Sequence, residues 1–451
     1  MAIVEDRRPD KIQGTDGVRG IVLSSSNKRI KGLHPLQAYI NEGVITEEFS
    51  FLYGYCLGKF LKRKKLLSEK DSVVVGWDPR DKDGFINSSF IEGLSRSCWK
   101  IVIAGTVPTP AAVIFMQYIG ACCAAVLTAS HNPPDQNGIK IFLSPLGMKL
   151  LPVDEIEFTK MLFDINLYKA KKEKKVAEII EMQSDAVECF KEFMIDPRNH
   201  LIPNGYDKSN FHILLDSANG GYSGIAKDVF KKVGFGDVVE TAGDLKENVN
   251  DGCGVTMVEG KSVWELSDKS HMSPIIEKMM RILSQKKNRL NEKKDILTGL
   301  VFDADGDRFI RLEADLRDRK IDILDGDKTA SLVANFMSYQ WEGVSNPLII
   351  NTIESDAGTG EFAESLGFNN KVTGVGDRWI LFYLIMGLIE EIIKNNRRLG
   401  LSISGLKELK SLYSSLKKGE NLSAVEISRT FESINLFKNK NMSTKIGELL
   451  L

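Results

Sequence analysis

The stretch from Leu127 to Lys140, which reads Leu-Thr-Ala-Ser-His-Asn-Pro-Pro-Asp-Gln-Asn-Gly-Ile-Lys, constrains the fold of this chain more than any other. An apolar run, Ala124 to Leu127, leads into it, and a second run, Ile139 to Leu143, leaves it. Short apolar runs bounded by turn residues are typical of buried strands. The pattern therefore predicts a strand, a polar loop and a second strand.

The loop between these runs is predicted to be stiff. Pro133 and Pro134 fix φ and cannot donate hydrogen bonds, so the chain cannot continue here as a helix or a ladder. Asn137-Gly138 is typical of a tight turn. A hairpin that uses Ser, Asn, Pro and Gly for turn chemistry alone would have a similar composition. The loop presents a hydroxyl, an imidazole and an ammonium together, at Ser130, His131 and Lys140.

The stretch resembles the phosphoserine loop of the α-D-phosphohexomutase superfamily, which comprises phosphoglucomutases, phosphomannomutases and phosphoglucosamine mutases. Its match to the T-A-S-H-N-P-x-x-x-N-G-I-K pattern of that family is nearly complete. The resemblance implies that Ser130 carries a phosphoryl group, that Lys140 is an acid/base or phosphate-binding residue, and that His131 belongs to the catalytic set. A serine hydroxyl must be positioned and activated, and phosphoryl transfer depends mainly on positioning and charge neutralisation.

A glycine-rich segment near the N-terminus, Gly14 to Gly20, is by itself a weak signal for more than a turn. Together with the serine loop it resembles the G-T-x-G-x-R-G motif of the same family. The resemblance implies that Arg19 approaches the phosphoserine, where it would bind phosphate and take part in proton transfer. A guanidinium suits this role because its planar fork contacts two phosphate oxygens at once.

A second candidate site follows the apolar run from Leu300 to Phe302, where three aspartates alternate with other residues. Three carboxylates at one strand end are costly unless a cation compensates them, and hard oxygen ligands suit Mg²⁺. An EF-hand is excluded because Arg308 and Ala314 stand where that loop needs Gly and Glu. A haloacid-dehalogenase phosphatase remains the alternative. The string Asp-Ala-Asp-Gly-Asp-Arg, from Asp303 to Arg308, resembles the metal loop of the mutases far better. The resemblance implies Mg²⁺ ligands at Asp303, Asp305, Asp307 and phosphorylated Ser130, with Arg308 facing phosphate.

Sugar-binding residues are expected further along the chain. Val375 to Trp379 resembles the family's V-G-D-R-Y segment, which implies that Gly376, Asp377 and Arg378 lie near the sugar, although a structural salt bridge explains the last two equally well. The family's G-E-E-S-G-G-like loop is altered here. Its nearest match keeps Ser404, whereas Ser402 and Ile403 replace the carboxylates. A serine cannot replace a charge-assisted carboxylate bond, so we expect weaker sugar binding.

Composition restricts the class of protein. The 451 residues are 43% hydrophobic and 27% charged with a net charge of −1, which gives no reason to expect nucleic acid or a membrane as partner. Six scattered cysteines without a C-x-x-C pair, and an N-terminus without an apolar core, predict a cytoplasmic protein. No apolar run is long enough to span a bilayer.

The predicted fold is α/β: three consecutive phosphohexomutase-type α/β/α domains with mixed sheets, and the fourth domain of the family absent or vestigial. Beyond Leu422 the sequence shows no motif like the family's C-terminal phosphate clamp. The expected divisions are residues 1–165, 183–260, 261–425 with the metal loop, and a tail over 426–451.

The function implied by the resemblance is a phosphohexomutase that acts on small hexose phosphates. It would move a phosphoryl group between the 1- and 6-positions through phospho-Ser130 and a bisphosphate, with Mg²⁺ as cofactor and hexose 1,6-bisphosphate as activator. The altered sugar loop and the missing clamp predict impaired turnover. The alternative is a degenerate relative without turnover, which binds sugar phosphates or acts as a regulatory protein.

Overall fold

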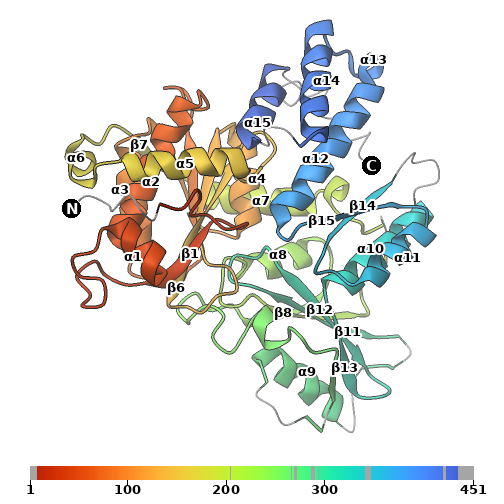
Figure 1. Ribbon diagram of the computed structural model, residues 1–451. Coiled ribbons are helices and arrows are strands. Elements are labelled where there is room, and N and C mark those ends of the chain that lie inside the picture. Colours follow the sequence, from red (N-terminus) through yellow and green to blue (C-terminus); the bar gives the residue numbers. More distant parts are fainter. Residues whose placement is uncertain are drawn as a thin grey trace.

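The structure, a computed structural model, describes most of the chain and combines several β-sheets with helices that cover them (Figure 1). Helices and strands alternate along the sequence, which confirms the predicted mixed α/β class. No helix in the described part of the chain is both long and apolar enough to cross a lipid bilayer. The described residues are 8–203, 205–265, 267–268, 272–285, 290–292, 294–340, 347–419 and 423–434.

The first sheet has seven strands in the order β2-β1-β6-β5-β3-β4-β7. Strands β5, β3, β4 and β7 run parallel to one another, whereas β6 is antiparallel to both of its neighbours. The strands are β1 (Val18–Val22), β2 (Val44–Ile45), β3 (Val73–Trp77), β4 (Lys100–Thr106), β5 (Cys123–Leu127), β6 (Gln136–Leu143) and β7 (Glu178–Glu181). The helices of this part are α1 (Pro35–Glu42), α2 (Glu47–Arg63), α3 (Phe85–Ser95), α4 (Thr109–Ile119), α5 (Pro152–Asp164), α6 (Leu167–Lys172) and α7 (Gln183–Ile195).

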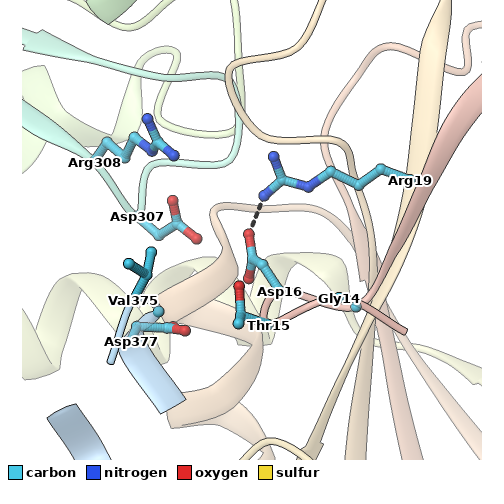
Figure 2. Close-up of a pocket in the computed structure, with 10 residues that line it drawn as sticks. Gly14, Thr15, Asp16, Arg19, Asp307, Arg308, Val375 and Asp377 are labelled. Atoms are coloured by element: carbon cyan, nitrogen blue, oxygen red, sulfur yellow. Dashed lines mark hydrogen bonds and ion pairs between the residues drawn. The ribbon is translucent and has the colours of Figure 1, made fainter. Parts of the chain in front are cut away.

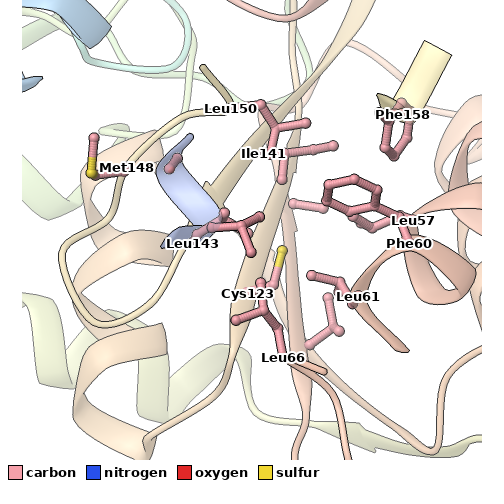
Figure 3. Packing of buried hydrophobic residues seen from close by; sticks show 14 of the residues in the cluster. Leu57, Phe60, Leu61, Leu66, Cys123, Ile141, Leu143, Met148, Leu150 and Phe158 are labelled. Carbon is pink, nitrogen blue, oxygen red and sulfur yellow. The ribbon is translucent and has the colours of Figure 1, made fainter. Parts of the chain in front are cut away.

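Successive side chains of a strand point to opposite faces of the sheet. Helices pack on both faces of the first sheet, so this part of the chain has three layers: helices, sheet and helices. Val73 and Val75 of β3 belong to a core that includes residues of α2, α3 and α5, whereas Val74 belongs to a second core with residues of α4 and α7. In the first core, the rings of Phe60 and Phe158 meet edge-on with centroids 5.4 Å apart (Figure 3). The sheet is therefore buried on both faces, as its nearly unbroken apolar strands require.

The predicted strand, loop and strand around the serine are present as β5 and β6. The prediction of a turn at Asn137-Gly138 is wrong, because both residues lie inside β6 and pair with β1. A side chain cannot be accommodated at Gly138, since a Cβ there would lie 2.2 Å from the carbonyl oxygen of Val18. The glycine is thus required by close strand packing and not by a turn.

The second sheet has six strands in the order β10-β13-β12-β11-β8-β9. It contains strands from both sides of the predicted division between residues 260 and 261, so the metal loop belongs to the same sheet as β8 and β9 and does not open a third domain. The strands are β8 (Phe211–Asp216), β9 (Asp237–Ala242), β10 (Val263–Glu265), β11 (Ile296–Phe302), β12 (Phe309–Asp315) and β13 (Lys320–Leu324), with helices α8 (Ile225–Lys232) and α9 (Pro274–Ser284).

The last part of the described chain begins with a small parallel pair, β14 (Leu348–Thr352) and β15 (Asn369–Thr373), covered by α10 (Gly326–Gln340) and α11 (Ala357–Ser365). Four helices follow: α12 (Asp377–Lys394), α13 (Asn396–Leu399), α14 (Ile403–Lys417) and α15 (Ala424–Ser433). Buried residues of α12, α14 and α15 join the core of the first sheet, beside which these helices lie in Figure 1.

The expectation of a tail over residues 426–451 is corrected in part. Residues 426–433 belong to α15, and Ile427 and Phe431 are buried. The helix is held by Asp154 of α5, whose carboxylate accepts hydrogen bonds from the Ser423 hydroxyl and from the backbone N–H of Ala424, both at 2.6 Å. Residues 435–451 lie outside the described residues.

Candidate active site

Ser130 follows β5 and is fully buried in a backbone conformation that side chains rarely adopt, with φ of +54°. Its backbone N–H donates to Oγ1 of Thr128 at 2.8 Å. Its carbonyl oxygen accepts from Nη2 of Arg80 at 2.6 Å, and the guanidinium is paired with the buried carboxylate of Asp78. These partners hold the serine in its strained conformation.

Three carboxylates face the serine from the turn between β11 and β12. Asp303, Asp305 and Asp307 each contribute an oxygen, and these oxygens lie within 4.8 Å of one another. Oγ of Ser130 donates to Asp303 and lies 3.4 Å from Oδ1 of Asp307. The structure thus places the serine and the three aspartates side by side. Asp305 is also held by the first sheet, since Oγ1 of Thr109 donates to it at 2.5 Å.

The chemistry of this group fits a hard divalent cation. Burial and the charges of Asp305 and Asp307 raise the pKa of Asp303 well above its usual value, and burial and Asp305 also raise that of Asp307. Oδ1 of Asp305 is buried and has no hydrogen-bond partner among the described residues. Crowded carboxylate oxygens with an unused acceptor are a donor set that suits Mg²⁺.

Lys140 is enclosed among carboxylates and has no exposed side-chain surface. Its ammonium donates to Oδ2 of Asp305 at 2.6 Å and to Asp307, and it lies 3.4 Å from Oδ2 of Asp16. Burial lowers the pKa of this ammonium, but the three carboxylates outweigh burial and raise it well above its usual value. In this arrangement Lys140 is a fixed positive charge, and its predicted acid/base role stays a prediction.

A cavity of about 420 Å³ borders this group of charges at Asp16 and Asp307 (Figure 2). Two of the predicted anion-binding side chains, Arg19 and Arg308, line it from opposite sides, with the carboxylate of Asp307 near Arg308. The full lining is Gly14, Thr15, Asp16, Gly17, Arg19, Asp307, Arg308, Val375, Gly376 and Asp377. The N-terminal motif, the metal loop and the segment before α12 therefore meet at one site.

Asp16 is surrounded by cations at the edge of this cavity. Its carboxylate accepts hydrogen bonds from Arg19 and from the buried ammonium of Lys149, and Lys140 is close by. Burial raises the pKa of Asp16, but the charges of Lys140, Lys149 and Arg19 outweigh burial and hold it far below its usual value. Arg19 is fixed from a second side, since Nη1 donates to Oδ1 of Asn132 at 3.1 Å. The guanidinium is therefore oriented before any ligand binds.

His131 is half-buried, and the Nδ1 atom of its ring has no hydrogen-bond partner among the described residues. Burial and the positive charges of Arg308 and Arg19 lower the pKa of His131 to about 4. The imidazole is therefore neutral at pH 7 and has a nitrogen that is able to accept a proton.

The structure separates the predicted sugar-binding residues. Gly376 and Asp377 line the cavity, and Asp377 also accepts from Nζ of Lys149 at 2.8 Å. Arg378 is buried and donates to Oε1 of Glu155 on α5 at 2.6 Å, so it holds α12 on the first sheet and does not line the cavity. Ser404 lies in the exposed first turn of α14, also outside the lining.

Sequence reasoning missed several residues that complete the site. Asp16 lies inside the recognised N-terminal motif, so its presence beside Arg19 could have been inferred. Arg80 and Thr109 lie in two short segments, Asp78-Pro79-Arg80 and Val107-Pro108-Thr109-Pro110, whose proline-rich composition indicates a turn and not a role in the site. Lys149 has no local signal, because only the fold brings it between Asp16 and Asp377.

Comparisons with known proteins agree with this arrangement. Residues 10–163 match the family model for phosphoglucomutase/phosphomannomutase, alpha/beta/alpha domain I. A phosphoglucosamine mutase from Caldicellulosiruptor saccharolyticus is 30% identical over 84% of this chain and 71% of its own length. One from Dictyoglomus thermophilum is 28% identical over 88% of this chain and 71% of its own length. A phosphoglucomutase/phosphomannomutase family protein from Burkholderia thailandensis shares the fold, with a TM-score of 0.55 at 17% identity over 83% of this chain and 68% of that one.

Proposed function

The chain belongs to the α-D-phosphohexomutase superfamily, and on that premise we propose that it is a phosphohexomutase. The proposed reaction moves a phosphoryl group between the 1- and 6-positions of a hexose phosphate, through phosphoserine at Ser130 and a hexose 1,6-bisphosphate. The hydrogen bond from Ser130 to Asp303 carries the proposal, because it joins a strained, buried nucleophile to a set of carboxylates beside an arginine-lined cavity.

Glucosamine phosphate is the hexose phosphate that we propose as substrate. The relatives at 28% and 30% identity are named phosphoglucosamine mutases. The cavity offers support of its own, because its lining combines two arginines with the carboxylates of Asp16 and Asp377. Arginines suit the phosphate of such a ligand, and a carboxylate suits the amino group when it is protonated.

The metal-binding residues of the proposal are Asp303, Asp305 and Asp307, joined by a phosphate oxygen on Ser130. Mg²⁺ held there would neutralise the charge that develops on the transferred group. The chain itself supplies the fixed charge of Lys140, which compensates Asp305 and Asp307, and the oriented guanidinium of Arg19.

Protons and bonds balance without any further reagent. In the first half-reaction the bond between phosphorus and Oγ of Ser130 breaks, and a bond forms between phosphorus and a sugar hydroxyl oxygen. The hydroxyl proton passes to Oγ of Ser130, and the neutral imidazole of His131, with its unpartnered Nδ1, is the proposed carrier. The second half-reaction reverses these steps at the other end of the sugar.

A coupled mutase assay with Mg²⁺ and hexose 1,6-bisphosphate tests the proposal. The 1-phosphates of glucose, mannose and glucosamine are offered in parallel to the wild-type protein and to Ser130→Ala. We expect conversion by the wild-type protein only, fastest with glucosamine 1-phosphate. Equal rates for the two proteins would contradict the proposed function.

A second candidate is a relative that binds sugar phosphates with little or no turnover. The observation in its favour is the position of Ser404 outside the cavity, so that the altered sugar loop contributes no described residue to the lining. Binding of a hexose phosphate by calorimetry, combined with no conversion in the coupled assay, would establish this second function in place of the first.

A further inference from the structure

The carbonyl oxygen of Ser130 is held by side chains from two different sheets. Arg80, which follows β3 in the first sheet, donates from Nη2 at 2.6 Å. Asn250, in the loop that follows β9 in the second sheet, donates from Nδ2 at 2.8 Å. The same amide nitrogen of Asn250 lies 3.0 Å from the carbonyl oxygen of Asn132. One side chain thus binds both backbone carbonyls that flank His131.

These two contacts require a hydrogen-bond donor at the end of the side chain of residue 250. Both partners are backbone carbonyl oxygens, which only accept hydrogen bonds, so the atom between them must be a donor. The amide of Asn250 supplies two N–H groups from one nitrogen, which is enough for both carbonyls. A carboxylate of the same shape would place negative charge against two carbonyl oxygens instead.

Asn250 is itself fixed by the second sheet. Its backbone has φ of +56°, and its N–H donates to the carbonyl oxygen of Ala218 at 3.1 Å. The buried carboxylate of Asp216, at the end of β8, accepts from the backbone N–H groups of Ala218 at 2.9 Å and Gly254 at 3.1 Å. The loop that contains the amide is therefore tied to β8, the strand next to β11, and Asp303 directly follows β11.

The serine loop needs this support because it satisfies only part of its own backbone, through the N–H groups of Asn132 and Gln136. Pro133 and Pro134 have no N–H, and buried carbonyl groups require donors. Arg80 covers the carbonyls of Ser130, Pro133 and Gln136 from the first sheet. Asn250 adds its two bonds from the sheet that also bears the metal loop.

We propose that Asn250 is a positioning residue: its amide clamps the backbone of the Ser130 loop against the second sheet, and so holds the serine oxygen at the distance from Asp303 that phosphoryl transfer needs. The inference rests on the proposed function and deepens it. Two bonds then cross between the sheets at the nucleophile, one from the hydroxyl and one to the carbonyl. Loss of the amide leaves the Ser130 carbonyl held by Arg80 of the first sheet but without its donor from the second sheet, and small displacements of a reacting group slow transfer strongly.

Two substitutions separate the amide from the backbone conformation. Asn250→Asp keeps the size of the side chain and the tolerance of positive φ but removes the donor. Asn250→Gly keeps the positive φ and removes the whole side chain. Asn248→Asp and Asn248→Gly are the matched controls, because Asn248 lies in the same loop, and its exposed side chain accepts from Nζ of Lys82 at 3.4 Å and makes no hydrogen bond to the Ser130 loop among the described residues.

The first measurement is steady-state mutase activity. We expect both Asn250 variants to lose about tenfold or more in kcat with KM changed by no more than about twofold, because the amide positions the nucleophile and does not bind substrate. The second measurement is deuterium uptake by the backbone amides of residues 128–138, which should rise in both Asn250 variants and stay unchanged in the Asn248 variants.

The outcomes distinguish the inference from the function on which it rests. A folded Asn250→Asp protein with wild-type kcat, or with unchanged deuterium uptake over residues 128–138, would overturn the inference while the mutase function stands. If the wild-type protein shows no mutase activity, the proposed function fails, and the deuterium uptake alone then decides whether Asn250 holds the loop.

Discussion

The hydroxyl of Ser130 donates a hydrogen bond to the carboxylate of Asp303, although 173 residues separate the two in the chain. A similar long-range bond joins Thr109 to Asp305 at 2.5 Å. In both cases the first sheet supplies the hydroxyl and the second sheet the carboxylate. The candidate site therefore exists only where the two sheets meet, and its geometry depends on their packing as much as on the motifs themselves.

Substitution of Ser130 by alanine should abolish covalent phosphorylation. The wild-type protein, incubated with a hexose 1,6-bisphosphate and Mg²⁺, is expected to gain the mass of one phosphoryl group, and peptide mapping should locate it on Ser130. Ser217→Ala is the matched control, because Ser217 is also a buried serine directly after a strand, where it donates to Glu240 at 2.5 Å. Phosphate found on Ser217 or Thr128 would contradict the assignment.

Substitution of Asp305 by asparagine should weaken Mg²⁺ binding by about tenfold or more, since it removes a charged oxygen ligand from the set. Isothermal titration of Mg²⁺ into the two proteins measures the change, and phosphorylation of Ser130 should strengthen binding in the wild-type protein because it adds negative charge. Asp318→Asn, in the exposed turn between β12 and β13, is the control. Equal affinities for the wild-type protein and Asp305→Asn would place the metal elsewhere.

The buried ion pair between Arg378 and Glu155 predicts a large effect on stability. Their side chains are 4% and 1% exposed and their charged atoms lie 2.6 Å apart. Arg378→Ala leaves the carboxylate of Glu155 buried without its partner, which should lower the free energy of unfolding by about 3–5 kcal/mol. The exposed pair of Lys394 and Glu390 on α12 is the comparison, and Lys394→Ala should cost less than about 1 kcal/mol. Urea denaturation of the three proteins checks both values.

The buried carboxyl group of Asp216 should make the free energy of unfolding depend on pH. Burial raises its pKa from 3.8 to about 6, despite hydrogen bonds from Gly254 and Ala218. Between these pH values the folded protein keeps a proton that the unfolded chain has released, so the free energy of unfolding falls as pH rises through the window. The expected loss is about 3 kcal/mol, complete above about pH 6.

The measurement for Asp216 is the difference between two titrations, because other groups also titrate in this range. Urea denaturation of the wild-type protein and of Asp216→Asn is carried out at several pH values across the window. The difference between the two free energies should change in favour of Asn as pH rises and then level off. A constant difference would mean that the carboxyl does not titrate within the window.

The strands of the first sheet could be predicted because local patterns determine them. The run before Ser130 became β5. Thr46, a residue type that is typical of the position before a helix, accepts a hydrogen bond from the N–H of Phe49 at 3.0 Å at the start of α2. The serine loop and the metal loop could be predicted for a similar reason, since each is a continuous string of residues with a recognisable chemistry.

What could not be predicted depends on contacts between distant segments. The division at residue 260 failed because β8 pairs with β11, and no local pattern records which strands share a sheet. Asn137-Gly138 has the composition of a turn, but close packing against β1 and Thr128 decided its conformation. Arg378 lies within a segment that resembles a family motif. Its partner is nevertheless the buried carboxylate of Glu155 on α5, a helix that is remote in the sequence.

Substitution of Arg19 by lysine should leave the protein folded but weaken its binding of the hexose phosphate. Its guanidinium lines the cavity and is held by Asp16 and by Asn132, so that it is oriented for a phosphate before the ligand arrives. Lysine keeps the charge but cannot contact Asp16, Asn132 and a phosphate oxygen through one planar fork. The loss of one charge-assisted hydrogen bond is worth about 1.5–3 kcal/mol, which corresponds to an increase in KM of about 10- to 150-fold.

The measurement for Arg19 is KM for the hexose 1-phosphate in the coupled assay, with thermal unfolding as the test of folding. Arg29→Lys is the control, since Arg29 forms an exposed ion pair with Glu42, with 47% of its side chain exposed, and does not line the cavity. We expect an unchanged KM for Arg29→Lys and an unchanged unfolding temperature for both variants. A wild-type KM for Arg19→Lys would show that charge alone is sufficient at this position, and that the hydrogen bonds to Asp16 and Asn132 serve the fold and not the ligand.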